Sequence, residues 1–168
     1  FLLMMLVPMQ AAAFSDLSEN DNYYFELTYL QDEGVLNGYD DGSMKPGNSI
    51  NRAELVKILV EGVKNAKPDS SKYRNCFNDV GTEWFAPYVC YAAEQGWVEG
   101  YSDGSFGPGK TVNKAESMKI VLEAFDVKIP SSSSGEWYQP YVDAAGLKNV
   151  LENKNLNPEK LQTRGEVG

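Results

Sequence analysis

The chain has 168 residues, of which 42% are hydrophobic and 12% aromatic, and this fits one globular domain or a compact array of repeats. A net charge of −9 argues against binding to nucleic acid or docking on an anionic membrane surface, because both need a basic face. The absence of His removes the commonest general base near neutral pH and the commonest transition-metal ligand. Carboxylate catalysis stays open, but no acidic pair stands out by spacing. We therefore expect no catalytic activity, no metal and no cofactor.

The chain opens with an apolar run over residues 1–9, followed by Gln10 and three alanines. This pattern is typical of the end of a signal-peptide core and its A-x-A cleavage site, here before Phe14. The run is too short to span a membrane, and a buried N-terminal helix is the alternative. We expect residues 1–13 to be a signal-peptide remnant of a longer gene product. The mature protein is then secreted and has no membrane-inserted segment.

An internal repeat organises the rest of the chain. Half of the residues of the segment 33–54 recur in the segment 95–116, 62 positions later, where EGVLNGYDDGSMKPG aligns with QGWVEGYSDGSFGPG. Upstream, residues 14–17 (FSDL) match residues 77–80 (FNDV), 63 positions later. A unit of this size cannot bury its apolar face alone, so the copies are expected to pack on one another.

Each copy is predicted to form a helix, an ordered loop and a second helix. In the second copy, residues 84–95 carry apolar side chains at helical spacing, and Gly96 is a natural stop. A turn-rich loop follows. Asn113 then offers an N-cap to a helix over 114–125, with Glu116 placed close to a capping box.

Some side chains of this unit allow two interpretations. We predict Trp84 and Trp97 to lie in the core rather than to stack on sugars, because large aromatic residues dominate burial. Phe125 is expected to continue the apolar face of the second helix. The acidic loop residues lack the D-x-D-x-D-G spacing of a calcium loop, and we interpret them as turn stabilisers: Asp40, Asp41 and Asp103.

Cys76 and Cys90 are the two cysteines of the chain. Cys76 precedes the FNDV segment, and Cys90 lies on the predicted helix that follows it. Burial of the apolar side chains of Phe77 and Val80 would favour folding of this segment back along the helix. An exported protein is also in an oxidising compartment, where disulfides persist. We predict a Cys76–Cys90 disulfide, with two buried thiols as the alternative.

A third, weaker copy follows a Ser-rich joint at 129–135. Its WYQPYV matches WFAPYV 53 positions earlier, and its TRGE matches NKAE 50 positions earlier, so three loop residues are missing. The Tyr-x-Asp-Gly element is absent, and the sequence stops shortly after Glu166. We predict three units, the third degenerate and truncated at its C-terminal end: copy 1 (14–66), copy 2 (73–128) and copy 3 (135–168).

These motifs resemble the S-layer homology family. The repeat of that family carries an F-x-D-V start, a W-x-x-x-Y/A-I/V helix, a G-x-x-x-G-Y-x-D-G-x-F-x-P loop and a T-R-A-E helix start. Copy 2 matches nearly throughout, with Lys114 in place of Arg; copy 1 has Met44 for Phe and lacks the Trp; copy 3 keeps Trp137 and Arg164. The resemblance covers roughly residues 14–168. It implies a mainly α fold with three helix–loop–helix repeats in a pseudo-threefold arrangement.

The resemblance also implies a function and a site. Such triplets hold secreted bacterial proteins non-covalently to secondary cell-wall polysaccharide or peptidoglycan-linked glycan, through grooves between repeats. An Arg binds a carboxylate in two places whereas Lys is a point charge, so the groove with Lys114 is expected to bind more weakly. Arg52 and Lys114 could also be plain surface charges of a first helical turn. Carried over residue by residue, the glycan-binding candidates are Arg52, Lys114, Arg164, Asp16, Asp79, Gly34, Gly96, Trp84 and Trp137.

Two other function classes remain open. One is a protein–protein assembly module of a surface layer that binds no glycan. The other is the anchoring end of a cell-wall enzyme whose catalytic domain lies outside these residues.

Overall fold

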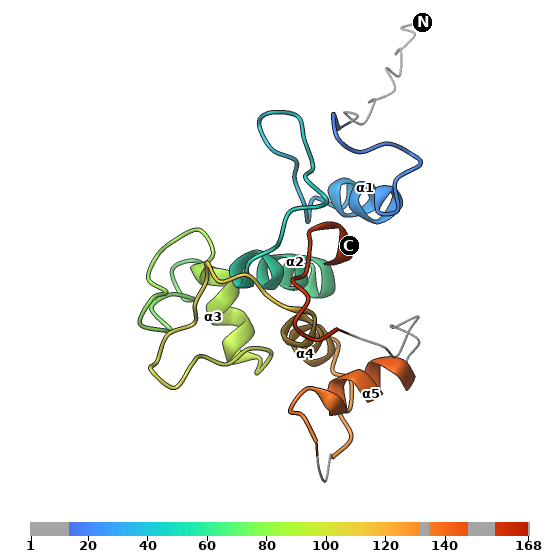
Figure 1. Ribbon diagram of the computed structural model, residues 1–168. Coiled ribbons are helices and arrows are strands. Elements are labelled where there is room, and N and C mark those ends of the chain that lie inside the picture. Colours follow the sequence, from blue (N-terminus) through green and yellow to red (C-terminus); the bar gives the residue numbers. More distant parts are fainter. Residues whose placement is uncertain (1–13, 132–134, 148–156, 168) are drawn as a thin grey trace, which may run out of the picture.

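The computed structural model describes residues 14–131, 135–147 and 157–167 and is mainly helical, as predicted (Figure 1). The predicted signal-peptide remnant and part of the Ser-rich joint lie outside the described residues. Within the described ranges, no helix has the length and apolar character needed to cross a membrane. The elements are α1 (Tyr24–Asp32), α2 (Arg52–Lys64), α3 (Ala86–Glu94), α4 (Lys114–Ala124), α5 (Gln139–Leu147) and the 3-10 turn η1 (Gly165–Val167).

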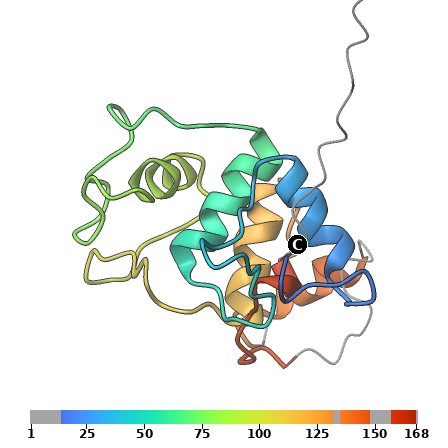
Figure 2. The same ribbon diagram turned by 90° about the horizontal axis from the view of Figure 1, so that it is seen from above.

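The two T-R-A-E-type helices, α2 and α4, lie side by side in the middle of the molecule (Figures 1 and 2). Helix α3 packs against α2, and α5 packs against α4. The main core gathers around α2, whose Leu55, Val56 and Val60 are fully buried. A smaller cluster joins Met118 and Leu122 of α4 to buried residues of α5. The motif helix of one copy therefore supports the first helix of the next copy.

Both central helices begin with the same capping box. The Asn51 side chain accepts the Glu54 backbone N–H at 2.9 Å, and the Glu54 carboxylate accepts the Asn51 backbone N–H at 3.0 Å. Asn113 and Glu116 repeat this exchange at 2.9 and 3.1 Å, which confirms the predicted cap. These reciprocal bonds satisfy N–H groups that the first turn of a helix leaves without an intrahelical partner.

The predicted helix over 84–95 is shorter in the structure, where α3 spans Ala86–Glu94. Trp84 and Phe85 lie in the turn before it, because Pro87 sits in the first turn and sets where the helix can begin. The other end agrees with the prediction. Gly96 follows the helix with a φ of 78°, a backbone conformation that glycine adopts without strain.

Three sequence-distant segments meet in a ring of backbone hydrogen bonds. Ile50 N–H donates to the Gln162 carbonyl at 3.0 Å, Gln162 N–H to the Val112 carbonyl at 2.9 Å, and Val112 N–H to the Ile50 carbonyl at 3.2 Å. Each of the three residues precedes its T-R-A-E-type motif by the same interval, and all three are buried. We call this set the central ring.

Two outer layers also connect the three copies cyclically, with the donor-to-acceptor order opposite to that of the central ring. Arg52, Lys114 and Arg164 donate their backbone N–H groups to the carbonyls of Lys110, Lys160 and Asn48, at 2.9 Å in each case. The next residue of each motif bonds to a proline carbonyl of the same neighbouring copy. The three-copy arrangement and its predicted boundaries stay a prediction, which this cyclic bonding supports.

The predicted disulfide between Cys76 and Cys90 is present, with the two Cα atoms 5.5 Å apart. It ties the segment before copy 2's FNDV motif to the middle of α3. Phe77 and Val80 are joined by a tight antiparallel bridge, and Val80 is fully buried. The fold-back that the sequence suggested is therefore correct.

Reduction of this disulfide is expected to lower the free energy of unfolding by about 3 kcal/mol, because it releases a short closed loop in the unfolded chain. Urea unfolding with and without dithiothreitol measures the difference. The Cys76→Ser/Cys90→Ser double variant is the control and should not respond to dithiothreitol. Equal unfolding midpoints of the wild-type protein in both conditions would contradict the prediction.

Candidate functional site

The Asp of each F-x-D motif clamps the loop of its own copy. In copy 2, the Asp79 carboxylate accepts the backbone N–H of Phe106 at 2.7 Å and of Gly107 at 2.8 Å. Asp16 does the same in copy 1, with bonds of 2.7 and 2.8 Å. Burial would raise the pKa of Asp79, but the two N–H donors outweigh it and hold this pKa below its ordinary value. The Asp79 carboxylate thus stays charged, and the hydrogen bonds of both carboxylates fix the loops of their copies.

The Arg of copy 1 reaches into the loop of copy 2. Arg52 is only 8% exposed, so it is not the surface charge that the sequence left open as an alternative. Its Nε donates to the Phe106 carbonyl at 3.0 Å and its Nη2 to the Glu99 carbonyl at 3.2 Å. The guanidinium carbon lies 4.6 Å from the centre of the Phe106 ring. A buried cation at a helix N-terminus is unfavourable by itself, and these carbonyls offset that cost.

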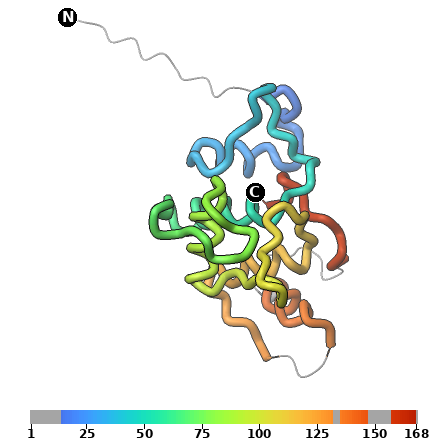
Figure 3. Tube along the Cα trace, turned by 90° about the vertical axis from the view of Figure 1, so that its left-hand side faces the viewer, coloured from blue at the N-terminus to red at the C-terminus, as the bar shows by residue number. Residues whose placement is uncertain are grey.

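Copy 3 docks on copy 1 in the same way. Arg164, 6% exposed, donates from Nε to the Met44 carbonyl and from Nη2 to the Asn37 carbonyl, both at 3.0 Å. Figure 3 shows the C-terminal segment beside the loop of the first copy, where these bonds form. In both interfaces the Nη2 acceptor lies three residues after the helix-ending glycine, Gly34 or Gly96. The structure thus gathers the predicted Arg, Asp and Gly residues at two loops.

A tyrosine ring of each loop lies between cations of two copies. The Tyr101 ring centre is 5.3 Å from the Arg52 guanidinium carbon and 3.8 Å from Lys110 Nζ. The Tyr39 ring of copy 1 has Arg164 at 5.0 Å and Lys45 at 4.1 Å. Both tyrosines are more than a third exposed. Each interface therefore presents an accessible aromatic ring next to cations of two copies, of which Lys45 also pairs with Asp41 at 3.0 Å.

The third interface is built differently, because copy 3 lacks the Tyr-x-Asp-Gly loop. Lys114 Nζ forms an ion pair with the Glu166 carboxylate at 3.3 Å, and Lys160 Nζ approaches the same oxygen at 2.8 Å. Burial would raise the pKa of Glu166, but the bonds from Lys160, from the Thr163 N–H and from Lys114 lower it to about 2. The predicted Lys114 site is thus an ion-pair cluster.

The two predicted tryptophans lie on the surface at matching positions. Trp84 is 59% exposed and Trp137 is 54% exposed, so the prediction of a core role for Trp84 is wrong, whereas Trp97 is buried as predicted. Each exposed indole meets the next aromatic ring edge-on, at 5.4 Å to Phe85 and 5.8 Å to Tyr138. Phe85 and Tyr138 are half-buried, whereas the two indoles remain exposed. Each indole lies just before the first helix of its copy.

Two smaller predictions have opposite outcomes. Phe125 is 59% exposed, so it does not continue the apolar face of α4, which ends at Ala124. Asp41 and Asp103 each accept the backbone N–H of the serine two residues later, at 3.0 and 2.9 Å, which confirms their role as turn stabilisers. 

Sequence reasoning missed a bond between copies that occurs twice. The Tyr88 hydroxyl of α3 donates to the Glu61 carboxylate of α2 at 2.7 Å, and the Tyr141 hydroxyl of α5 donates to Glu123 of α4 at 3.3 Å. Burial, together with Glu61, raises the pKa of Tyr88 to about 12. The signal was present in the repeat, because both members of each pair recur at the repeat spacing.

Comparison with known proteins links these features to a family. The family model described as the S-layer homology domain matches residues 13–56 and 77–116. The chain is 28% identical over 95% of its length to a surface-layer 125 kDa protein of Lysinibacillus sphaericus, and corresponds to 15% of that protein. It is 21% identical over 91% of its length to a cellulosome-anchoring protein of Acetivibrio thermocellus, and corresponds to 35% of it.

Enzymes are also among the similar proteins. The chain is 30% identical over 57% of its length to an amylopullulanase of Thermoanaerobacterium thermosulfurigenes and corresponds to 6% of that protein. The chain thus spans about a third or less of the length of the curated relatives it matches.

Arg52→Ala is expected to lower the free energy of unfolding by about 1.5–3 kcal/mol, because two buried carbonyls lose a charged donor. Thermal or urea unfolding measures this loss. Lys119→Ala is the matched control: Lys119 lies on the neighbouring helix and pairs with the exposed Glu99 carboxylate at 3.4 Å. Its removal should cost less than about 1 kcal/mol. Equal effects of the two variants would show that the guanidinium does not hold the interface.

Glu166 should make stability depend on pH in the acid range. Its pKa in the folded state is about 2 against an ordinary value of 4.5, so its contribution is complete above pH 4.5 and is lost as the pH falls toward 2. We expect the stability difference between the wild-type protein and Glu166→Gln to shrink across this window. Unfolding curves at a series of pH values measure it, and a constant difference would contradict the ion-pair role.

Proposed function

This chain belongs to the S-layer homology domain family, whose model matches half of its residues, and we propose that it binds a cell-wall glycan through its inter-copy grooves. At the coarser level, the family and the relatives make it an anchoring module of a secreted cell-surface protein. The proposal adds the ligand class, secondary cell-wall polysaccharide or peptidoglycan-linked glycan, and the residues that contact it. It also holds that these residues catalyse no reaction themselves.

The exposed tryptophans are the observation that carries this proposal. An indole that is more than half exposed gains little from burial in the folded protein, so its position needs another reason. Trp84 and Trp137 occupy the same place in two copies and present flat apolar faces. Sugar rings have apolar faces that pack on such indoles. We therefore place the stacking contacts of the glycan at these two side chains.

The charged groups of the interfaces supply the polar half of the proposed site. Lys45 and Lys110 stand over the exposed tyrosine rings of the two complete loops. Arg52 lies at the inner wall, where its two backbone bonds use two of its five N–H donors. A carboxylate on the glycan would meet these cations despite the acidic net charge of the chain.

The other proposed contacts follow from this placement. Asp16 and Asp79 hold the loops, and Gly34 and Gly96 leave open space beside them, since a Cβ at either glycine would meet nothing within 4 Å. Lys114, paired with Glu166, marks the groove that we expect to bind most weakly. The full set of proposed glycan-binding residues is Arg52, Lys114, Arg164, Asp16, Asp79, Gly34, Gly96, Trp84 and Trp137.

One alternative is supported by the relatives. The match to an amylopullulanase favours an anchoring end attached to an enzyme. This alternative concerns the attached domain and leaves the proposed groove unchanged. An assembly module that binds other surface-layer proteins, by contrast, would need no glycan at all.

The double variant Trp84→Ala/Trp137→Ala is expected to weaken sedimentation with purified cell walls about tenfold, because two stacking contacts are lost. Its unfolding curve should match that of the wild-type protein to within about 1 kcal/mol, since both indoles are exposed. The measurement is a cell-wall pull-down over a range of protein concentrations.

Two controls make this test specific. Phe25→Ala removes a side chain that is also exposed but lies on α1, outside the proposed site, and should bind walls like the wild-type protein. Walls from which the polysaccharide has been extracted should bind neither the wild-type protein nor the Phe25→Ala variant. Unchanged binding of the double variant, or full binding to extracted walls, would favour the protein-assembly alternative.

A further inference from the structure

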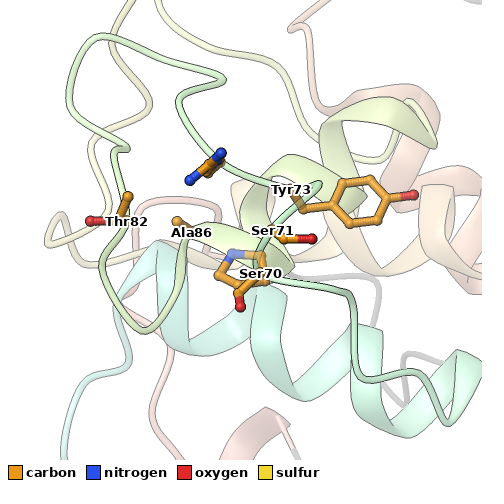
Figure 4. A pocket seen from close by; sticks show the side chains of 7 residues that line it. Ser70, Ser71, Tyr73, Thr82 and Ala86 are labelled. Atoms are coloured by element: carbon orange, nitrogen blue, oxygen red, sulfur yellow. The ribbon is translucent and has the colours of Figure 1, made fainter.

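A pocket of about 340 Å³ opens at the amino-terminal end of α3 (Figure 4). It is lined by Ser70, Tyr73 and Arg74 of the segment before copy 2's FNDV motif, by Thr82, and by Ala86 and Pro87 of α3. Its volume lies at the lower end of the range for ligand pockets, about 300–1,000 Å³. A ligand the size of one monosaccharide therefore fits it.

The walls of this pocket are fixed in place. Cys76 follows Arg74 by two residues, and Cys90 lies one helical turn after Pro87, so the disulfide ties the two walls together. Tyr73 is held by its ring edge against Tyr91, with centroids 5.5 Å apart. Its hydroxyl also donates to the Glu94 carboxylate at 2.6 Å. A site whose walls are already ordered loses little conformational entropy when a ligand binds.

The polar groups that line the pocket are available to a ligand. Across the residues that the structure describes, the side chains of Arg74, Ser70 and Thr82 form no hydrogen bond or ion pair with the protein. The carboxylates adjacent to lining residues in the sequence each accept a backbone N–H: Asp69 accepts that of Ser71 at 2.8 Å, and Glu83 accepts that of Gly81 at 2.7 Å. The guanidinium is thus the free charged group of the lining.

We propose that this pocket binds a monosaccharide unit that carries a carboxylate. The Arg74 guanidinium offers a planar pair of N–H donors that matches a carboxylate. The Ser70 and Thr82 hydroxyls can both donate and accept, as sugar hydroxyls require. Half-buried Pro87 supplies an apolar surface for one face of the sugar ring, whereas Ala86 is fully buried. Helix α3, about 13 Å long, lies between the pocket and Gly96, whereas Trp84 stands between the lining residues Thr82 and Ala86, so the pocket adjoins the proposed glycan site at this tryptophan alone among its members on α3 and the turn before it.

The test uses the 15N-labelled, disulfide-bonded protein and sodium D-glucuronate as the probe. We expect saturable chemical-shift changes of backbone amides within residues 70–87 on addition of glucuronate. Neutral D-glucose and sodium acetate should each bind at least about tenfold more weakly, because each lacks one half of the recognised chemistry. The titration needs no cell wall, so its result is independent of the sedimentation test of the grooves.

Variants then assign the binding to Arg74. Arg74→Gln should weaken glucuronate binding about tenfold, and Arg74→Lys should restore part of it, because Lys keeps the charge without the fork. Lys67→Gln is the matched control; it removes an exposed charge from the same segment outside the pocket and should bind like the wild-type protein. Three results would overturn the proposal: no saturable shift in 70–87, shifts confined to the loops 37–45 and 99–107, or equal binding of acetate and glucuronate. Unchanged binding by Arg74→Gln would also overturn it.

Discussion

The central ring is the interaction on which the rest of the structure depends. Three backbone N–H groups, from Ile50, Val112 and Gln162, each bond to the carbonyl of a neighbouring copy. Because backbone bonds hold at this point whatever the side chains are, the ring sets the mutual position of the three T-R-A-E-type motifs. The capping boxes then fix where each motif helix begins. The direction in which Arg52 and Arg164 can reach follows from that placement.

The inter-copy arginines hold the loops that form the exposed surface at two of the interfaces. Each guanidinium holds carbonyls of a loop that belongs to another copy, and the F-x-D carboxylate holds the same loop from within its own copy. The loop is therefore fixed from two sides, and its tyrosine ring stays exposed at a defined place. Copy 3 lacks the Tyr-x-Asp-Gly sequence, and at its interface Lys114 pairs with Glu166. The missing Tyr-x-Asp-Gly sequence of copy 3 and the Lys in place of Arg at position 114 thus occur at the same interface.

Much of the fold could be predicted because repeated local signals agreed with one another. The Asn–Glu capping boxes, the helix-ending Gly96 and the disulfide depend on residues close in sequence, and all were predicted correctly. The exposure of Trp84 could not be predicted, because periodicity shows that a face is apolar but not where neighbouring copies stop covering it. The prediction for Phe125 is wrong for the same reason, since this residue lies just beyond the last turn of α4.

The sequence identified residues of the candidate site, but not which of them bond to one another. The motif identified Arg52, Asp79 and Gly96, yet nothing local indicates that an arginine of one copy bonds to the loop of the next. That pairing depends on the cyclic order of the copies, which is a property of the assembled fold. The Tyr88–Glu61 bond was missed for a related reason, although its recurrence as Tyr141–Glu123 made it detectable.

The cyclic bonding has a consequence for how the chain folds. In a linear repeat array each unit contacts only its neighbours in sequence, so folding can begin anywhere and spread. Here Arg164 bonds to the carbonyls of Met44 and Asn37, 120 and 127 residues away in the chain. Such contacts carry a large loop-closure entropy and form late, which slows folding and couples the first and last copies in one cooperative transition. A chain of this kind reaches its native state only after its last motif has emerged, and its copies cannot be added or removed one at a time.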